Sequence, residues 1–437
     1  MDQESVLIVG CGVFGLSTAL ELARKGKHVC VIDKYEPPSP WSAANDFNKI
    51  IRCEYNNKTY AKLAVEALHL WRSDPLYKKS FKECGRLLVT PMNHKQRETF
   101  ESEGIKNIQD LGEGLNYQYL TGSEEVASRF SCFAENNIPN EQQVKFNPEG
   151  GLGVSNKTLN DVYNLLKSLP NVRFYFGDNG TAVNIQRKNN GEAIITATSG
   201  LLHTASIVII AAGANTGSIL NLENQQSATG LFVTHIQLNK SEYMKYAGMP
   251  VVYDSEIAYF FPPDSKTKIM KLCVTGSGIK RVVGDPHNAN SQISLPRYHN
   301  ENPKDTIPLD LIPIIKKALI KYVPELQNHK LFGSKICWVA DRENSNFLID
   351  KVPNYSNLYV ATGDSGHGFK FFPNIGKYIV EMIDGNLDSN LKALWRWESR
   401  IHMELVDPAK SAWRTVKRRT RDLSELHFVK EFEKSKF

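Results

Sequence analysis

The stretch VLIVGCGVFGLSTALELARKGKHVCVIDKYE, residues 6–36, decides the fold. Its first four residues are apolar, and three glycines follow in Gly-x-Gly-x-x-Gly spacing at Gly10, Gly12 and Gly15. Apolar side chains then recur at helical intervals up to a fourth glycine, which is typical of a helix C-terminus. A second apolar segment ends on Asp33. We predict a strand, a tight turn, a helix and a second strand.

The glycine spacing and the acidic residue are typical of a dinucleotide site. Gly10 permits the tight turn, Gly12 lets a pyrophosphate approach backbone N–H groups, and Gly15 lets helix and strand pack closely. The positive end of the helix faces the phosphates, and the Asp33 carboxylate can accept hydrogen bonds from both ribose hydroxyls. A tight turn without a ligand does not explain Asp33, so we expect a nucleotide cofactor here.

The composition favours a globular protein. The chain has 437 residues, enough for two domains, and 41% of them are hydrophobic. Its longest apolar run, residues 207–214, is too short to span a bilayer, so we expect no membrane segment and, from the first residues, no cleaved leader. The seven cysteines lack Cys-x-x-Cys spacing, which argues against disulfides and a metal site and favours a reducing compartment.

The formal net charge of +6 is unevenly distributed. The segment KSAWRTVKRRTR, residues 410–421, has six basic residues and no acidic one. Nucleic-acid binding is one interpretation, but no aromatic stacking platform accompanies the segment. A solvated tail or a basic rim over an anionic substrate is favoured, and we expect no nucleic-acid partner.

The order of patterns favours an α/β protein with a discontinuous cofactor domain. After the first unit we expect a helix within 150–169, a strand at 172–177, strands near 181–198 and an apolar strand within 205–217. A strand, a glycine loop and a helix follow at 357–385. The small residues that end the apolar strand, Ala-Ala-Gly-Ala, suit close approach of a flat cofactor.

Other segments predict a second, antiparallel sheet that covers the substrate. Residues 251–263 are typical of a hairpin turning near Ser255 and Glu256, and residues 268–274 of a further strand. The predicted boundaries are 1–84, 149–225 and 335–395 for the cofactor domain, 85–148 and 226–334 for the substrate domain, and 396–437 for a C-terminal basic segment and tail.

Several motifs together resemble the amadoriase branch of the sarcosine-oxidase-like FAD amine oxidases, which contains L-saccharopine oxidases and fructosyl amino acid oxidases. The motifs are the glycine triplet, SAANDFNKIIRCEY (42–55), AAGA (211–214), KICWVADREN (335–344) and ATGDSGHGFKFFPNIGK (361–377). The resemblance implies a glutathione-reductase-type, Rossmann-like FAD domain. It also implies oxidation by O₂ of a C–N bond in an N-substituted amino acid, giving H₂O₂ and an imine that hydrolyses.

The resemblance also implies a covalent bond between the flavin and Cys337. Related enzymes join a cysteine to the flavin 8α-methyl group, and the neighbouring Lys335 can favour the thiolate that this chemistry needs. The alternative is an ordinary buried cysteine on a strand.

Four basic residues receive roles from the same resemblance. Lys370 and Arg52 bind the substrate carboxylate, Lys271 activates O₂, and Lys49 matches a lysine common in the amadoriases, which we take as catalytic. A helical turn would place Lys49 and Arg52 on one face, and a guanidinium suits a planar carboxylate. A solvated surface position is the alternative for Lys370, Lys49 and Arg52, and an ordinary strand lysine is the alternative for Lys271.

The remaining candidates line the expected cofactor and substrate sites. The predicted cofactor-binding residues are Gly10, Gly12, Val13, Phe14, Gly15, Asp33, Lys34, Ser42, Asn48, Lys49, Val183, Gly213, Cys337, Asp364, Ser365, Gly366, Gly368, Phe369 and Lys370. Thr275 and Arg414 are the further candidates for binding substrate.

The substrate is predicted from one segment in which this chain differs from the fructosyl amino acid oxidases. Fructosyl amino acid oxidases usually follow the lysine matching Lys271 with an acid-bearing segment, whereas this chain has Thr275 and then Lys280 and Arg281. A more basic pocket favours a more anionic substrate. We rank L-saccharopine first, fructosyl amino acids second, and smaller N-alkyl or cyclic imino acids such as sarcosine and pipecolate below.

Two other classes remain as alternatives. An NAD-dependent dehydrogenase would use Asp33 equally well but does not need Cys337 in its motif or the late glycine loop. A non-enzymatic module that binds nucleic acid or membrane through the basic segment leaves the cofactor motifs unexplained.

The last three residues, Ser435-Lys436-Phe437, differ from the peroxisomal address Ser-Lys-Leu only at the final side chain. We expect recognition by the peroxisomal import receptor, with a cytoplasmic location as the alternative. We also expect a monomer.

Overall fold

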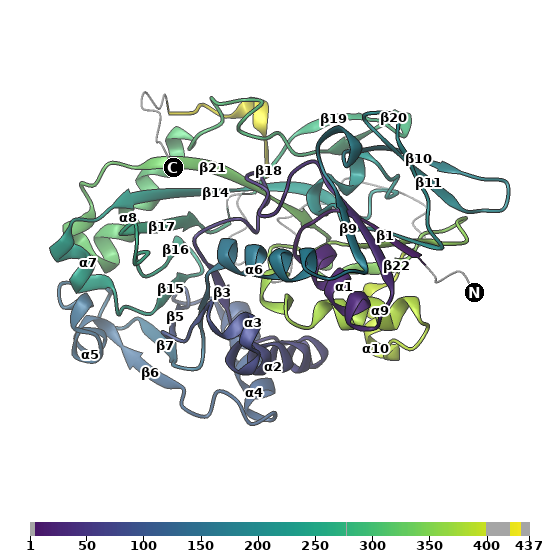
Figure 1. The fold of residues 1–437 in the computed structure, drawn as a ribbon. Helices are drawn as coiled ribbons and strands as arrows, with labels where there is room; N and C mark the ends of the chain where they lie inside the picture. Colours follow the sequence, from purple (N-terminus) through teal and green to yellow (C-terminus); the bar gives the residue numbers. More distant parts are fainter. Residues whose placement is uncertain (1–4, 277, 399–419, 430–437) are drawn as a thin grey trace.

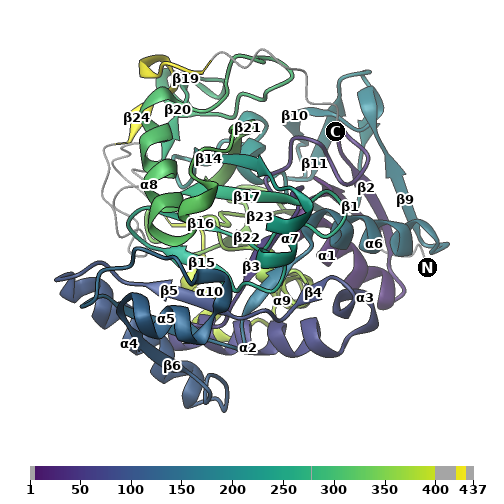
Figure 2. The same ribbon diagram turned by 90° about the vertical axis from the view of Figure 1, so that its left-hand side faces the viewer.

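The computed structural model describes residues 5–276, 278–398 and 420–429. It contains two large sheets side by side, with helices packed mainly around the outer faces (Figures 1 and 2). No helix in these ranges is long and apolar enough to cross a membrane.

The first large sheet has six strands and holds the predicted cofactor turn. All neighbouring strands are parallel except the edge pair β22–β23. Its order is β22 (Leu348–Lys351), β23 (Leu358–Thr362), β13 (Ile207–Ile210), β1 (Ser5–Val9), β2 (His28–Ile32) and β9 (Val172–Tyr175).

The predicted strand–helix–strand unit is confirmed. Helix α1 (Val13–Arg24) lies between β1 and β2 and packs against α6 (Ser155–Lys167) and α9 (Ile375–Ile383). Gly10 has φ of +114°, and a Cβ on Gly15 would lie 1.9 Å from the Gly10 carbonyl oxygen. These two positions therefore require glycine, one for the turn and one for the close approach of helix to strand.

The second large sheet has ten strands and is mixed. Its path is β24 (Arg421–Asp422), β18 (Ile279–Lys280), β14 (Ser227–Gln237), β17 (Ile269–Val274), β16 (Ala258–Phe260), β15 (Val251–Asp254), β5 (Arg86–Val89), β7 (Gln143–Asn147) and β6 (Gln118–Thr121), with β21 (Phe332–Asp341) also paired to β14. The predicted hairpin is β15–β16 and the further strand is β17.

This sheet departs from the expected antiparallel one at two places. Strands β5 and β15 are parallel, as are β18 and β24. Parallel pairing needs a long crossover, and both pairs are separated by long stretches of chain that provide it. Strand β21 also belongs to this sheet, whereas the sequence predicts residues 335–341 in the cofactor domain. The predicted domain boundaries otherwise stay a prediction.

Smaller elements complete the fold. Two small three-stranded sheets and a hairpin accompany the large sheets: β3 (Lys49–Ile51), β8 (Gly151–Gly153) and β4 (Phe81–Lys82); β10 (Ala182–Arg187), β11 (Ala193–Ala197) and β12 (Leu202–His203); and β19 (Val282–Asp285) with β20 (Asn288–Ser294). The other helices are α2 (Lys58–Ser73), α3 (Pro75–Lys78), α4 (Lys95–Gln109), α5 (Gly122–Arg129), α7 (Lys240–Tyr246), α8 (Ile312–Tyr322) and α10 (Ser389–Trp395).

The helical turn predicted for Lys49 and Arg52 is wrong. Lys49 begins strand β3, which pairs with β8, and Arg52 directly follows that strand. The two β-branched residues between them favour an extended backbone, and the partner strand β8 is supplied from about a hundred residues further along the chain.

Candidate active site

Two adjoining cavities lie where the two large sheets meet. The first has a volume of about 330 Å³ and extends from the turn after β1 to β21. The second has about 160 Å³ and is bounded by β3, β5, β17 and α4. Both cavities are lined by Lys49, Leu231, Tyr259, Gly366 and Phe369. A ligand in the first cavity can therefore contact a ligand in the second.

The first cavity begins at the predicted dinucleotide turn. A Cβ on Gly12 would meet nothing within 4 Å, so the backbone there is open to the cavity. The Asp33 carboxylate accepts hydrogen bonds from the backbone N–H of Cys11 at 2.7 Å and of Tyr35 at 3.1 Å. Burial raises the pKa of Asp33, and these two N–H groups oppose that rise. The residues present therefore fit the adenosine and pyrophosphate of FAD.

Most predicted cofactor-binding residues line this cavity. They are Gly10, Gly12, Val13, Phe14, Asp33, Lys34, Ser42, Lys49, Gly213, Cys337, Asp364, Gly366, Gly368 and Phe369.

Five predicted cofactor-binding residues lie elsewhere. Gly15 packs helix against strand, and Lys370 lines the second cavity instead. Val183 is 51% exposed, while its neighbour Ala182 lines the first cavity. Asn48 and Ser365 are buried outside both linings. The main reason is that a neighbour in sequence, rather than the named residue, points toward the cavity.

Cys337 lies on β21 at the end of the first cavity nearest the second. It is buried, and β21 pairs it with Leu231 of β14. Burial alone would lower the pKa of Lys49, but Asp46 and, after it, the Cys337 sulfur raise it. The Lys335 ammonium instead donates to the carbonyl oxygen of Asn45 at 3.1 Å. Its predicted effect on the thiol stays a prediction.

The glycine loop after β23 closes the cavity beside Cys337. Ser365 has φ of +45°, and its hydroxyl donates to the Gly363 carbonyl. The Asp364 carboxylate accepts from the backbone N–H of Ala340 at 3.0 Å and of Gly366 at 3.2 Å. Burial raises the pKa of Asp364 to about 6. These contacts fix the loop so that its backbone lines the cavity.

A buried carboxylate that the sequence analysis missed organises the junction between the cavities. The Lys271 ammonium donates to Asp46 Oδ2 at 2.9 Å and to the Asn48 carbonyl at 2.6 Å, and Lys49 donates to the same Asp46 oxygen at 3.2 Å. Burial alone would raise the pKa of Asp46, but the two ammonium groups hold it well below its usual range. Burial lowers the pKa of Lys271, and Asp46 opposes this.

Arg52 and Lys370 provide the second cavity with cations that have no carboxylate within 4.0 Å in the described ranges. The Arg52 guanidinium donates to the Glu54 backbone carbonyl, and the Lys370 ammonium donates to the His367 carbonyl at 2.8 Å. Burial lowers the pKa of Lys370, and the nearby Arg52 lowers it further. Both are therefore available to an anion brought by a ligand.

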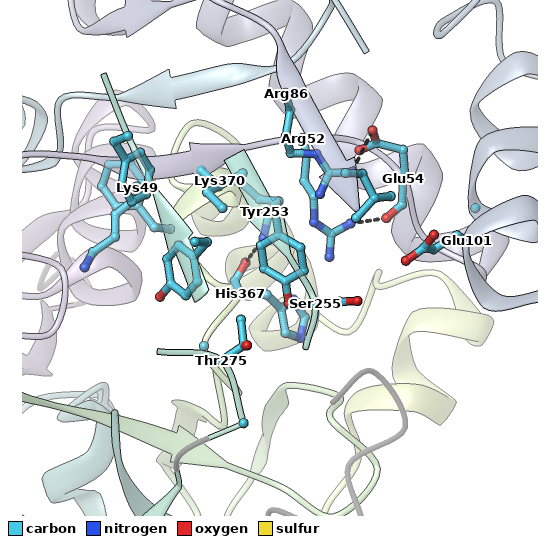
Figure 3. A pocket seen from close by; sticks show the side chains of 18 of the residues that line it. Lys49, Arg52, Glu54, Arg86, Glu101, Tyr253, Ser255, Thr275, His367 and Lys370 are labelled. Atoms are coloured by element: carbon cyan, nitrogen blue, oxygen red, sulfur yellow. Dashed lines mark hydrogen bonds and ion pairs between the residues drawn. The ribbon is translucent and has the colours of Figure 1, made fainter. Parts of the chain in front are cut away.

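The walls of the second cavity carry an excess of positive charge (Figure 3). Two carboxylates, Glu54 and Glu101, line it. Six basic side chains line it: Lys49, Arg52, Arg86, Arg97, Lys271 and Lys370.

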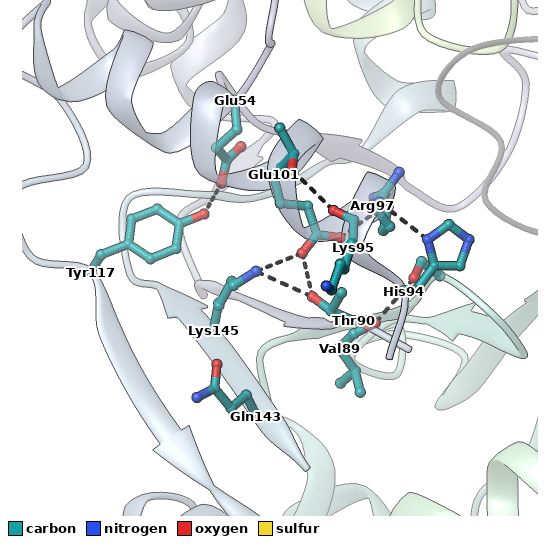
Figure 4. A network of polar contacts seen from close by, with 12 residues as sticks. Glu54, Val89, Thr90, His94, Lys95, Arg97, Glu101, Tyr117, Gln143 and Lys145 are labelled. Carbon is teal, nitrogen blue, oxygen red and sulfur yellow. Dashed lines mark hydrogen bonds and ion pairs between the residues drawn. The ribbon is translucent and has the colours of Figure 1, made fainter. Parts of the chain in front are cut away.

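Each of the two carboxylates is held by a buried network. Glu54 Oε1 accepts from Arg86 at 2.9 Å, Tyr117 at 2.6 Å and Asn147 at 3.0 Å. Glu101 pairs with Arg97 and with Lys145, as Figure 4 shows. The Lys145 ammonium lies 2.8 Å from Glu101 Oε2.

The predicted substrate residues are only partly brought together. Thr275 lines the second cavity, and its buried hydroxyl oxygen has no hydrogen-bond partner. Lys280 and Arg281 line neither cavity; the Arg281 guanidinium donates to the Pro296 carbonyl. The inference that they make the pocket basic is therefore wrong. Arg414 lies outside the described residues.

Four of the six basic lining residues were predicted from the motifs, and the other two carried no sequence signal. Arg86 and Arg97 lie on β5 and α4, in segments without a motif. Asp46 and Glu54 lie inside the quoted motif of residues 42–55 and could have been noted there as the acids nearest the predicted lysine and arginine.

The fold and the two cavities are those of a flavoprotein, and comparison with known proteins identifies its family. Residues 5–382 match the FAD dependent oxidoreductase family, so the chain belongs to that family. The predicted α/β fold class, FAD dependence and enzymatic nature are confirmed, and the NAD-dependent and non-enzymatic alternatives are not supported.

Named relatives narrow the class to oxidases. The chain is 38% identical to L-saccharopine oxidase of Schizosaccharomyces pombe, over 90% of this chain and 93% of that protein. It is 24% identical to a monomeric sarcosine oxidase of Bacillus sp. (strain NS-129), over 86% and 92%. The solved fructosyl peptide oxidase from E. terrenum matches with a TM-score of 0.89 and 31% identity, covering 99% of this chain and 98% of that one. The predicted branch of FAD-dependent amine oxidases is confirmed.

Proposed function

We propose that the protein oxidises the C–N bond of L-saccharopine, with O₂ as the final electron acceptor. The substrate loses a hydride from carbon and a proton from nitrogen, and the imine formed is hydrolysed by water. O₂ takes up the two electrons with two protons and becomes H₂O₂. FAD, when bound, supplies the two-electron chemistry that links these half-reactions. The relative that is 38% identical and carries this activity in its name supports the proposal.

The cationic second cavity is the observation that carries the substrate assignment. Arg52 and Lys370 bind the α-carboxylate next to the reacting carbon, and Thr275 offers its unpartnered hydroxyl. At an effective dielectric constant of about 20, one cation about 5 Å from a carboxylate contributes about 3 kcal/mol before desolvation. Basic residues in excess of acids around one cavity therefore favour an anionic substrate over a neutral one, and saccharopine is anionic.

This chain's own residues orient the substrate and place positive charge near the reacting atoms. The two cations orient the substrate so that the reacting carbon faces the junction with the first cavity, where Gly366 and Phe369 lie. Lys271, held by Asp46, places a positive charge where O₂ acquires negative charge. Lys49, which pairs with the same Asp46 carboxylate, contributes a second positive charge there.

A fructosyl amino acid is the second candidate substrate, because solved fructosyl peptide oxidases share this fold at 31% identity over nearly the whole chain. The deciding experiment measures kcat/KM from H₂O₂ production for saccharopine, fructosyl-valine, pipecolate and sarcosine. We expect saccharopine to exceed the others by at least about tenfold. A tenfold preference for fructosyl-valine would overturn the assignment.

Covalent attachment of FAD through Cys337 is the second part of the proposal. Its position on the wall of the first cavity, which Lys49 also lines, supports a bond between its sulfur and the flavin. Acid precipitation of the purified protein tests this, since a covalent flavin stays in a yellow pellet.

The cellular and oligomeric assignments complete the proposal. The tripeptide at residues 435–437 lies outside the described residues, and its sequence supports import by the peroxisomal receptor. A fluorescent fusion to the last ten residues tests this, and a diffuse signal would favour the cytoplasm. Light scattering on the purified protein measures its mass in solution and so tests the monomeric state.

A further inference from the structure

The ring of Tyr55 lies beneath both cations that have no carboxylate within 4.0 Å in the described ranges. The Arg52 guanidinium is 4.5 Å from the ring centroid, and the Lys370 ammonium is 5.6 Å from it. Tyr55 is 8% exposed and does not belong to the lining of the second cavity. Arg52 precedes Tyr55 by three residues, whereas Lys370 follows it much later in the chain. One aromatic ring therefore contacts two cations that line the same cavity.

The hydroxyl of Tyr55 is also held, by a hydrogen bond to His367. It lies 3.0 Å from Nδ1 of His367, whose Nε2 lies 2.8 Å from the Ser345 carbonyl oxygen. A carbonyl only accepts, so Nε2 carries the hydrogen, and Nδ1 accepts from the Tyr55 hydroxyl. The His367 carbonyl in turn accepts from Lys370. Tyr55 thus contacts Lys370 directly through its ring and indirectly through His367.

An aromatic face suits this position for a physical reason. A buried cation needs a favourable partner, and burial already lowers the pKa of Lys370. An internal carboxylate would supply that partner but would also compete with the carboxylate of the substrate. The negative face of an aromatic ring stabilises a desolvated cation without occupying its hydrogen-bond donors.

We propose that Tyr55 is a positioning residue whose ring holds Arg52 and Lys370 together as one carboxylate-binding site. This inference rests on the proposed function, because it takes these two cations to be the carboxylate site. It adds that their shared orientation comes from a residue that does not itself line the substrate cavity.

The test compares a charged and an uncharged ligand of the same shape on the holoenzyme. Calorimetric titration gives the Kd of propionate and of propionamide for wild type, Tyr55→Phe and Tyr55→Leu. Tyr55→Leu should weaken propionate about tenfold or more and propionamide by less than about threefold. Tyr55→Phe keeps the ring and should stay within about threefold of wild type for both ligands.

Two further variants separate positioning from folding. Tyr60→Leu removes a buried ring that stacks on Tyr55 at 5.5 Å and has no cation over it in the described ranges, so the ratio of the two Kd values should stay that of wild type. Should Tyr55→Leu fail to fold, a trifluorinated phenylalanine at position 55 keeps the shape of Tyr55→Phe but weakens the negative face. It should weaken propionate selectively.

Equal loss of both ligands in Tyr55→Leu, or a selective loss in Tyr60→Leu, would overturn the inference, as would a fluorinated ring with no effect. Arg52→Gln and Lys370→Gln distinguish this failure from that of the proposed function. If both weaken propionate but the Tyr55 variants do not, only the role of Tyr55 is wrong. If neither weakens propionate, the carboxylate site is wrong and both proposals fall.

Discussion

The ammonium nitrogen of Lys271 lies 2.9 Å from Oδ2 of Asp46, although 225 residues separate them in the chain. Each side chain is 2% exposed, and Lys49 contacts the same oxygen. One buried carboxylate therefore holds two cations at the junction of the cofactor and substrate cavities. This pairing sets both the stability of the junction and the position of the charge that O₂ would meet.

Asp46→Asn should lower the free energy of unfolding by about 3–5 kcal/mol, because it leaves Lys271 buried without its counter-charge. Urea unfolding of the holoenzyme monitored by circular dichroism measures this. Glu192→Gln, which breaks the exposed pair with Lys188, is the control and should leave the unfolding midpoint unchanged. An equally small change in Asp46→Asn would mean that the buried pair contributes little.

Lys271→Met should slow reoxidation of the reduced enzyme by O₂ by orders of magnitude and leave reduction by substrate nearly unchanged. The reason is that its positive charge acts on charge developing on O₂ rather than on the substrate. Stopped-flow absorbance near 450 nm follows the two half-reactions separately. Equal losses in both would contradict the assigned role.

Gly12→Ala and Gly15→Ala should fail in different ways. The added methyl group at Gly12 enters open cavity, so the protein should fold but bind FAD at least about tenfold more weakly, because pyrophosphate can no longer approach the backbone. At Gly15 the methyl group would meet the Gly10 carbonyl at 1.9 Å, so folding itself should suffer. Far-ultraviolet circular dichroism and flavin content measure the two effects. Normal FAD content in Gly12→Ala would exclude the proposed pyrophosphate position.

Glu54→Gln should lose a pH-dependent part of the stability. Burial alone would raise the pKa of Glu54, but Arg86 and Arg52 lower it to about 2. Because this pKa is below that of the unfolded chain, the ionised carboxylate stabilises the fold above about pH 4.5, and this contribution is lost as the pH falls toward 2. Urea unfolding at pH 7, 5, 4 and 3 should show the advantage of wild type over the variant shrinking with acidity. A constant difference would speak against an ionised, paired Glu54.

Cys337→Ser should fold and should lose the yellow colour of the acid-precipitated pellet. Serine keeps the size of the side chain but cannot form the thioether to the flavin. Absorbance of the pellet and of the supernatant after acid treatment measures bound and released flavin. Cys273→Ser, on β17 at the other side of β14 from β21, is the control and should keep the colour. Colour that survives in Cys337→Ser would assign the bond to another residue.

The sequence by itself determined the cofactor half of the protein. The glycine triplet, the helix after it and Asp33 lie within thirty-one consecutive residues, so their geometry follows from local turn and helix preferences. The glycine loop at 363–368 was equally predictable, because its strand, turn and helix are consecutive. Such elements need little information from the rest of the chain.

Only the tertiary structure decided which charges line the substrate cavity beside the four basic residues predicted from the motifs. Lys280 and Arg281 follow the predicted site residues Lys271 and Thr275 in sequence but line neither cavity. Arg86 on β5 and Arg97 on α4 line the second cavity instead. The ion pair of Asp46 with Lys271 likewise joins segments that meet only when the two sheets pack. Side-chain direction along a strand and contacts between distant segments depend on register and packing, and a single sequence carries no local pattern for either.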